Sequence, residues 1–403
     1  MHTEFAPRYA TLPEAERARG ILRSCVHCGF CAAACPTYQL TGDELDGPRG
    51  RIYLIKQLLE GGSVSAQTQL HLDRCLTCGA CETACPSGVR YRSLLEIGRE
   101  LVDQEVARGR RDRWLRWFML RVVCDAGRFA LAARLGRLLR WGLPAGLRAV
   151  LPGKPLQPLL PPQRQHARRM LVLRGCVQPT ATPRTNTAAA RVLDRLGITL
   201  MEVPEAGCCG AISHHLTAPE HARELARRNI DAWWPQVEAG AEAIVMTASG
   251  CGLMVKEYRE LLRTDADYAA KAERISALAL DLCEVLAREP LQACAGIGQG
   301  RRIAFQSPCT LRHGHGLGGV IEDILRRCGY ALTDIPADMA CCGAAGPYML
   351  LQRELSEQLR EQALAMLQQW QPTVIASANV GCQMHLAQRA QVPVIHWIEL
   401  LDR

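Results

Sequence analysis

Short apolar runs alternate with longer segments of helical periodicity from about residue 170 to the end of the chain. The apolar runs that we expect to form buried strands are residues 170–173, 243–246, 303–305 and 373–376. The segments that we expect to form helices between them are residues 184–196, 218–234 and 350–369. An alternation of this kind predicts parallel α/β units.

The first 105 residues follow a different pattern, in which one amphipathic stretch joins two cysteine-rich runs. Ile52, Ile55 and Leu59 are spaced so that they share one face of a helix over residues 50–59. A second helix is expected after the second run, over residues 91–106. This part of the chain is therefore predicted to be mainly helical.

A basic amphipathic segment follows. Residues 108–169 contain fourteen Arg and one Lys against two Asp, whereas the whole chain has a formal net charge of only +8. One helical face carries Leu131, Leu135, Leu138 and Leu139. The other face carries Arg134, Arg137 and Arg140. Three aromatic residues precede both faces in the sequence: Trp114, Trp117 and Phe118. This pattern is typical of a helix on an anionic membrane surface, and it equally fits a helix packed on a partner subunit. Nucleic-acid binding is disfavoured, because no motif of a nucleic-acid-binding fold accompanies the charge.

Prolines and a repeat set the expected domain boundaries. A proline-rich linker ends the basic segment, with Pro144, Pro152, Pro155, Pro158, Pro161 and Pro162. Beyond it, Cys176, Cys208-Cys209-Gly210 and Cys251 recur as Cys309, Cys341-Cys342-Gly343 and Cys382, with 32 residues from the first cysteine to the pair each time. Internal duplication explains this recurrence. The predicted domains are residues 1–105, 106–168, 169–295 and 296–403, and the predicted fold class is α+β and α/β, a mainly helical domain followed by a duplicated α/β domain.

The composition of the chain limits the roles that its cysteines can have. The chain has 403 residues, is 48% hydrophobic and contains twenty cysteines, and no run of residues is apolar enough to span a bilayer. Residues 1–10 lack the features of a secretory signal, so we expect a cytoplasmic protein. In a reducing compartment, clustered cysteines more often bind metal or carry out redox chemistry than form disulfides.

The two cysteine-rich runs have the spacing of iron–sulfur ligands. Cys25-x-x-Cys28-x-x-Cys31-x-x-x-Cys35-Pro36 is followed by Cys75-x-x-Cys78-x-x-Cys81-x-x-x-Cys85-Pro86. In two-cluster ferredoxins the fourth cysteine of each run ligates the other cluster. We therefore expect two 4Fe–4S clusters, one held by Cys25, Cys28, Cys31 and Cys85, the other by Cys75, Cys78, Cys81 and Cys35. Structural zinc is the alternative, but zinc sites use separated Cys-x-x-Cys pairs instead of three successive steps and a Cys-Pro.

The duplicated cysteines are candidates for further redox or metal sites. They follow predicted strands, and open α/β sheets place their sites beyond the carboxyl ends of strands, so each set is expected to converge. The first set is Cys176, Cys208, Cys209 and Cys251, and the second is Cys309, Cys341, Cys342 and Cys382. His313, His315 and His385 are possible extra ligands. Cys124, Cys283, Cys294 and Cys328 fit a role as small buried hydrophobes.

The duplicated pattern resembles the Cys-Cys-Gly domain of heterodisulfide reductases and of iron–sulfur subunits of flavin-linked dehydrogenases. That family pattern ends in Cys-x-x-Cys, whereas here its last position holds Met254 in one half and His385 in the other. Four thiolates per half are still enough for a conventional cluster or a dithiol site. The departure argues against a stand-alone disulfide reductase.

Nearly the whole chain resembles the iron–sulfur subunits of bacterial glycolate oxidase, the quinone-linked glycolate dehydrogenase. The cysteine motifs carry the resemblance, together with residues 42–46 (Gly-Asp-Glu-Leu-Asp) and 48–56 (Pro-Arg-Gly-Arg-Ile-Tyr-Leu-Ile-Lys). It implies an oxidoreductase subunit whose FAD-containing partners oxidise glycolate to glyoxylate, while this chain passes electrons to an acceptor such as quinone. No flavin or nicotinamide motif occurs in this chain.

The same resemblance implies a peripheral position on the cytoplasmic face of the inner membrane, with residues 108–169 as the possible contact. Iron–sulfur subunits of glycerol-3-phosphate and lactate dehydrogenase complexes share the architecture and are the alternatives within the same class. A zinc-stabilised binding module without a redox role is the alternative from a different functional class.

Overall fold

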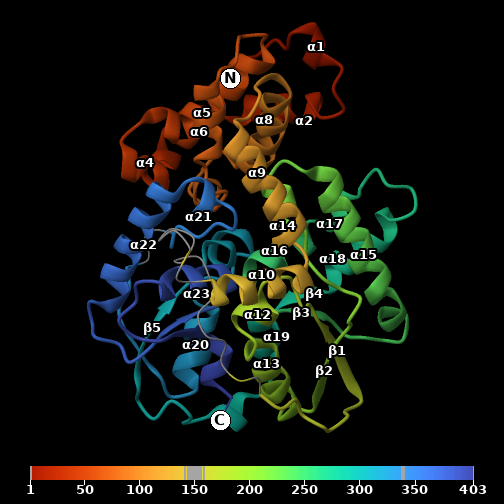
Figure 1. The fold of residues 1–403 in the computed structure, drawn as a ribbon, viewed down its shortest axis with the longest axis vertical. Helices are drawn as coiled ribbons and strands as arrows, with labels where there is room; N and C mark the ends of the chain where they lie inside the picture. The colour runs from red at the N-terminus through yellow and green to blue at the C-terminus, as the bar shows by residue number, and fades with distance from the viewer. Residues whose placement is uncertain (1, 140–141, 143–156, 158, 337–340, 403) are drawn as a thin grey trace. The chain divides into compact units, whose positions relative to one another are not determined.

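The computed structural model describes residues 2–139, 142, 157, 159–336 and 341–402 (Figure 1). The chain forms two compact units, one of Met1–Leu115 with Gly343–Arg360, the other of Arg116–Cys342 with Glu361–Arg403. Arg140 and Trp141 of the basic segment, and Pro144, Pro152, Pro155 and Pro158 of the expected linker, lie outside the described residues. The four domain boundaries stay predictions.

The first unit is built from short helices around the two cysteine runs. In chain order these are α1 (Pro7–Ala10), α2 (Ala15–Ser24), α3 (Phe30–Ala33), α4 (Pro36–Thr41), η1 (Glu44–Asp46), α5 (Pro48–Leu59), α6 (Ala66–Asp73), α7 (Ala80–Thr83), α8 (Tyr91–Glu105) and, after residue 343, α21 (Tyr348–Leu351). Helix α9 (Arg110–Phe118) and helix α22 (Arg353–Gln368) each continue into the second unit.

Helices α5 and α8 form the centre of the first unit. Pro48 occupies the first position of α5, where the missing N–H is harmless. Ile52, Ile55 and Leu59 are all buried, as their predicted common face requires. Gly98 of α8 faces Ile55, and a Cβ added there would lie 2.6 Å from the Ile55 side chain, so the two helices touch at a glycine.

The second unit contains two parallel sheets with the same strand order. The first is β2-β1-β3-β4 and the second is β6-β5-β7-β8. Their strands are β1 (Arg168–Val172), β2 (Ile198–Glu202), β3 (Ile244–Met246) and β4 (Ala279–Asp281), then β5 (Arg302–Gln306), β6 (Ala331–Leu332), β7 (Ile375–Ser377) and β8 (Val394–His396). The four predicted strands are present, and the predicted fold class and duplication are confirmed.

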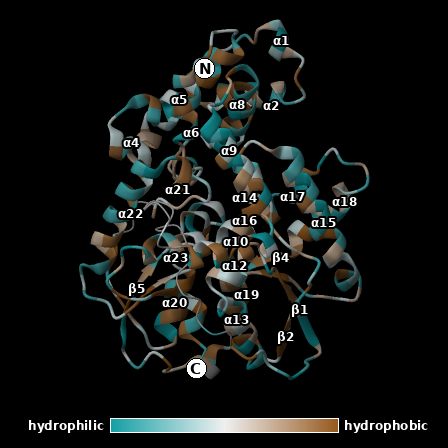
Figure 2. Cartoon of the chain, in the orientation of Figure 1, coloured by the Kyte–Doolittle hydropathy of each residue, from teal (hydrophilic) through white to brown (hydrophobic). Residues whose placement is uncertain are grey.

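Helices connect these strands and cover the sheets. They are η2 (Met119–Val123), α10 (Ala126–Leu138), α12 (Gln178–Ala181), α13 (Thr185–Asp194), α14 (Ala211–His215), α15 (Pro219–Glu238), α16 (Ser249–Lys256), α17 (Tyr258–Leu261), α18 (Ala269–Leu278), α19 (Leu282–Arg288), η4 (Leu291–Cys294), η5 (Thr310–Gly314), α20 (Val320–Arg327), α23 (Val380–Ala387) and η6 (Trp397–Leu400). Strand β5 carries the hydrophobic colour in Figure 2, whereas α15 is mixed, as expected for a helix with one solvated face. In the described part of the chain, no helix is long and apolar enough to cross a membrane.

Two predicted helix boundaries were wrong. Helix α15 continues past Pro235 to Glu238, because a proline near the end of a helix removes only one hydrogen bond before the helix stops. The helix predicted from residue 350 begins instead at Arg353, because Gln352 leaves the helical conformation (φ −123°, ψ 52°) and separates α21 from α22.

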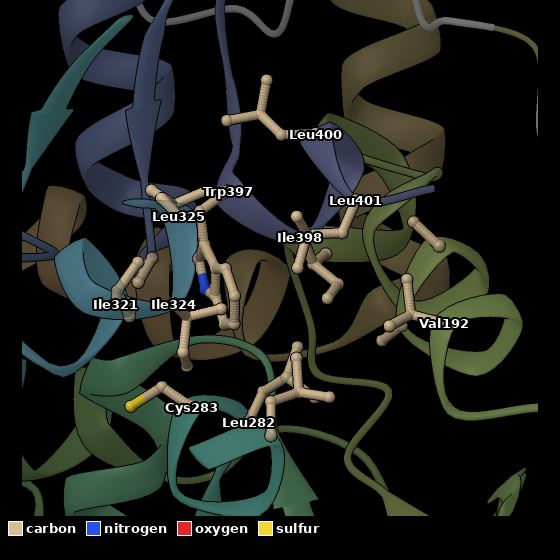
Figure 3. Packing of buried hydrophobic residues seen from close by; sticks show 14 of the residues in the cluster. Val192, Leu282, Cys283, Ile321, Ile324, Leu325, Trp397, Ile398, Leu400 and Leu401 are labelled. Carbon is tan, nitrogen blue, oxygen red and sulfur yellow. The ribbon is translucent and has the colours of Figure 1, made fainter. Parts of the chain in front are cut away.

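The two halves of the second unit share one hydrophobic core. Figure 3 shows Trp397 beside Ile324 and Leu325 of the second half, with Leu282 and Cys283 of the first half close by. The His396 side chain joins the halves through a 2.8 Å hydrogen bond from Nε2 to the Thr247 carbonyl. Complete burial lowers the pKa of His396 to about 3, so this ring is neutral and can accept from the Ile398 N–H at Nδ1.

The contact between α5 and α8 gives a test of packing. Gly98→Ala should lower the free energy of unfolding by ~1–3 kcal/mol, because its Cβ overlaps Ile55. Gly20→Ala is the matched control, since Gly20 lies in α2 with nothing within 4 Å of its added Cβ; it should raise stability by up to ~1 kcal/mol. Denaturant unfolding followed by circular dichroism measures both, and equal effects would contradict the proposed contact.

Candidate metal centres

The eight cysteines of the two runs line two cavities. One cavity is lined by Cys25, Cys28, Cys31 and Cys85, with Cys81 also at its wall. The other is lined by Cys35, Cys75, Cys78 and Cys81. Each cavity thus takes three cysteines from one run and the last cysteine of the other.

The two runs have the same backbone conformation. His27 and Thr77, each directly before the second cysteine of its run, have φ of 56° and 55°. The glycines that follow, Gly29 and Gly79, have φ of 87° and 77° and begin helices α3 and α7. Left-handed residues at matching places turn each loop sharply, so that three successive thiols face one cavity.

Electrostatic interactions divide the thiols into the same two groups. Burial raises the pKa of Cys31, and the neighbouring Cys25, Cys28 and Cys85 raise it further. Burial also raises the pKa of Cys81, and so do Cys78, Cys75 and Cys35. Thiols so arranged ionise readily only when a metal supplies positive charge.

Tyr91, the first residue of α8, contributes to the walls of both cavities. It is 3% exposed, and burial together with the adjacent Cys75 raises the pKa of its phenol. Pro48 lines both cavities as well. The two cavities are therefore separated by individual side chains instead of a secondary-structure element.

A buried ion network supports the second cavity. Arg51 lines this cavity with its side chain fully buried, and donates hydrogen bonds to the His71 carbonyl (2.7 Å) and to Thr37 Oγ1 (3.2 Å). Asp46 lies 3.6 Å from Arg51 and accepts hydrogen bonds from Arg74 and His71, both at 2.8 Å.

Burial disfavours the charged guanidinium of Arg51, but Cys75, Tyr91, Cys35 and Asp46 outweigh that effect and raise its pKa. The stretch over residues 42–56 therefore places a permanent cation beside the thiols. Asp43, Asp46 and His71 are close enough together to hold a metal ion. Asp46 is already engaged by Arg51 and Arg74, so we interpret this group as part of the ion network.

The first duplicated set meets at the carboxyl ends of β1, β2 and β3. Cys176 and Cys209 both form thiol hydrogen bonds with Cys208, and Cys209 forms another with Cys251. Gly210 has a φ of 90°, and its added Cβ would lie 3.3 Å from the Ala222 carbonyl, so the turn packs closely on α15.

Two buried side chains hold the backbone of this turn. Asn229 donates to the Cys208 carbonyl at 2.9 Å and accepts from the Gly207 N–H at 2.8 Å. Tyr258 donates to the Cys209 carbonyl at 2.8 Å. The backbone of the adjacent cysteines is thus held by hydrogen bonds from side chains that make no contact with solvent.

The second duplicated set has the same arrangement. Cys309 and Cys341 lie 3.8 Å apart, and Cys342 forms thiol hydrogen bonds with Cys341 and Cys382. Gly343 is also left-handed, with a φ of 81°. His313 is half-buried, which lowers its pKa, and Cys341 is near enough to oppose that shift.

Met254, which replaces the last cysteine of the family pattern in the first half, is buried in its hydrophobic core. The two remaining candidate ligands are His315 and His385. His315 Nε2 lies 3.0 Å from the Ser249 carbonyl, and His385 is 2% exposed within α23.

The sequence predicts that Cys124, Cys283, Cys294 and Cys328 are small buried hydrophobes. Cys283, Cys294 and Cys328 do lie in the shared core, the last two in thiol contact with each other. Cys124 is different, because it clusters with Cys176 and Cys208. No spacing rule in the sequence links Cys124 to a repeat that begins 52 residues later; only its position in a segment with no other cysteine sets it apart.

Comparison with known proteins identifies the family. A family model for a 4Fe-4S dicluster domain matches residues 21–89, and a model for a cysteine-rich domain matches twice, at residues 170–256 and 303–387. The chain is 52% identical over its full length to the glycolate oxidase iron-sulfur subunit of Escherichia coli, covering 99% of that protein.

Two further relatives match with lower identity. The chain is 30% identical to a protein named "Probable glycolate oxidase iron-sulfur subunit" of Bacillus subtilis, over 91% of this chain and 88% of that one. It is 24% identical to lactate utilization protein A of Bacillus licheniformis, over 53% of this chain and 91% of that one.

The buried cation gives a prediction about the second cavity. Arg51→Gln should lower the reduction potential of a cluster held there by on the order of 60 mV, because a charge at this depth contributes ~1–2 kcal/mol to the reduced state. Arg51→Lys, which keeps the charge, should stay much closer to the wild type. Potentiometric titration followed by EPR measures both, and an unchanged potential in Arg51→Gln would refute the electrostatic role of Arg51.

Proposed function

Because this chain belongs to the family of glycolate oxidase iron–sulfur subunits, we propose that it carries electrons within a complex that oxidises glycolate to glyoxylate. FAD-containing partner subunits would carry out that oxidation, and this chain would pass the electrons to an acceptor. The observation that carries the proposal is the sorting of eight cysteines into two adjacent cavities with Tyr91 in both walls. Adjacent centres are what an electron relay requires.

The proposed ligands follow from the cavity walls. Cys25, Cys28, Cys31 and Cys85 would hold one 4Fe–4S cluster, and Cys35, Cys75, Cys78 and Cys81 the other. When bound, each cluster supplies one-electron transfer. The chain contributes thiolates, a largely apolar enclosure, and a positive charge from Arg51 that stabilises the more negative, reduced state.

Quinone is the acceptor we propose, with the protein bound to the cytoplasmic face of the inner membrane. Leu131, Leu135 and Leu138 recur along one face of α10 and are 58%, 50% and 77% exposed. Ala133, on the opposite face, is 2% exposed and packs inward. The leucine stripe therefore points away from the second unit.

The arginines beside the stripe, and the tryptophans that precede it in the sequence, fit a lipid surface. Arg128 and Arg134 are exposed on either side of the leucines. Trp114 and Trp117 of α9 are 57% and 56% exposed. Apolar residues flanked by cations and tryptophan suit an anionic membrane surface.

A lactate-oxidising complex is the second candidate, favoured by the match to lactate utilization protein A. The two candidates differ in the substrate of the partner subunits. Anaerobic addition of glycolate or L-lactate to the complete complex distinguishes them by which one reduces the clusters.

The cysteine assignment predicts that each cluster depends on one cysteine from the other run. Cys85→Ser should perturb the cluster of Cys25, Cys28 and Cys31, and Cys35→Ser that of Cys75, Cys78 and Cys81. EPR of the reduced complex, with iron and sulfide analysis, would reveal two different altered spectra. Zinc in place of iron would refute the electron-transfer role, and if each serine variant altered the cluster of its own run, the cross-ligation would be wrong.

The leucine stripe predicts binding to lipid. The double variant Leu135→Glu/Leu138→Glu should bind anionic phospholipid vesicles at least roughly tenfold more weakly in sedimentation, because a buried leucine contributes ~1.5–3 kcal/mol. Leu160→Glu is the matched control, since Leu160 is 82% exposed and lies outside the stripe. Equal binding by all three proteins would refute the membrane contact.

A further inference from the structure

Cys124 lies among the cysteines of the first duplicated set, although it precedes that domain in the sequence. The second unit contains a small buried cluster of Cys124, Cys176 and Cys208, which are 6%, 8% and 3% exposed. The thiols of Cys124, Cys176 and Cys209 each interact electrostatically with that of Cys208, and Cys209 with Cys251, so the cluster adjoins the remaining cysteines of the first duplicated set.

The segment that carries Cys124 is anchored on both sides. Before it, Met119 is buried in the π-helical turn η2, and Arg116 donates to the Leu216 carbonyl at 3.3 Å. After it, Asp125 caps α10 by accepting from the Arg128 N–H at 2.8 Å. Both anchors lie within two turns of helix of Cys124, so its thiol has little freedom to point elsewhere.

A buried cluster made of three thiols is a poor hydrophobic core. Cys283 shows the ordinary role, since it is fully buried among aliphatic side chains of the large shared core. The members of the small cluster that are themselves buried are all cysteines, with Val177, Ile212 and Leu225 packed around them. Clustered buried thiols are a donor set that a soft metal centre prefers, because it takes them as thiolates.

We propose that Cys124 is a ligand of an iron–sulfur cluster in the first duplicated half, together with Cys176, Cys208, Cys209 and Cys251. The position at which Cys-Cys-Gly domains usually carry their last cysteine holds Met254, which lies in the hydrophobic core. Cys124 restores a fifth thiol from outside the domain. Among the described residues of the second half no fifth cysteine joins the set, so the two halves are not equivalent as metal sites.

Ser213 provides a polar contact to the new ligand. Its hydroxyl, fully buried, lies 3.7 Å from Cys124 Sγ and 2.9 Å from His221 Nδ1. A Ser213 hydroxyl that donates to this sulfur would stabilise a metal-bound Cys124 thiolate.

The test compares Cys124→Ala with Cys208→Ala and Cys283→Ala in the complete complex, purified anaerobically from cells grown on ⁵⁷Fe. Cys208→Ala should remove one Mössbauer subspectrum and about four irons per chain. Cys124→Ala should remove or alter that same subspectrum, and Cys283→Ala should leave it unchanged. The EPR signals of the dicluster domain, recorded on the same samples, should be unaffected in all three.

Three results would overturn the proposal. The first is a Cys124→Ala spectrum identical to the wild type, the second is full retention of iron in Cys208→Ala, and the third is zinc at this site by metal analysis. If Cys124→Ala fails to fold, Cys124→Ser tests the same point, because it keeps the size and polarity of the thiol but is a poor ligand for iron–sulfur centres. Loss of the dicluster signals in the wild type would be a failure of the proposed function, separate from this inference.

Discussion

The constraint on which this protein depends is that thiols must be both buried and close together, although burial and proximity each oppose their ionisation. In the first unit the chain balances this with a fully buried cation, Arg51, held in place by Asp46. A buried ion pair is a weak source of stability in itself. The ion pair matters here because it holds one permanent positive charge beside the second cavity.

In the second unit the same constraint is met by topology. Parallel strands bring the turns after β1, β2 and β3 to one edge, where adjacent cysteines can be fixed from behind by Asn229 and Tyr258. The second half repeats this with the same strand order. The two edges are also joined directly, because the Ser249 N–H donates to the Ala378 carbonyl and the His396 side chain to the Thr247 carbonyl. A shared core then makes the two halves one folding unit.

Periodicity and spacing were enough to predict the class of fold, the four main strands and the duplication, because buried strands and repeated motifs leave local patterns. The same local patterns located the buried face of α5, including Ile55. Local patterns did not predict those features of the site that depend on contacts between residues distant in the sequence. The role of Arg51 requires knowing that Asp46 and Cys75 approach it, and the surroundings of Cys124 require knowing that η2 packs near α14. The prediction of where α15 ends was wrong for a local reason, because Pro235 indicates a helix end but the helix continues for one more turn.

Duplication initially yields two equal halves, and the structure indicates how they became different. Each half has lost the last cysteine of its motif, and the replacements have different consequences. Met254 joined a hydrophobic core, whereas His385 stayed buried within α23, near the same turn of helix as Cys382. In the described residues, the basic segment places Cys124 beside Cys176 and Cys208 of the first half. The same segment carries an exposed leucine stripe and a thiol of the small cysteine cluster, and it connects the surface of this unit to its interior, because α10 begins at the residue after Asp125, directly beyond Cys124. The stripe therefore lies on a helix whose N-cap, Asp125, is the residue next to that thiol.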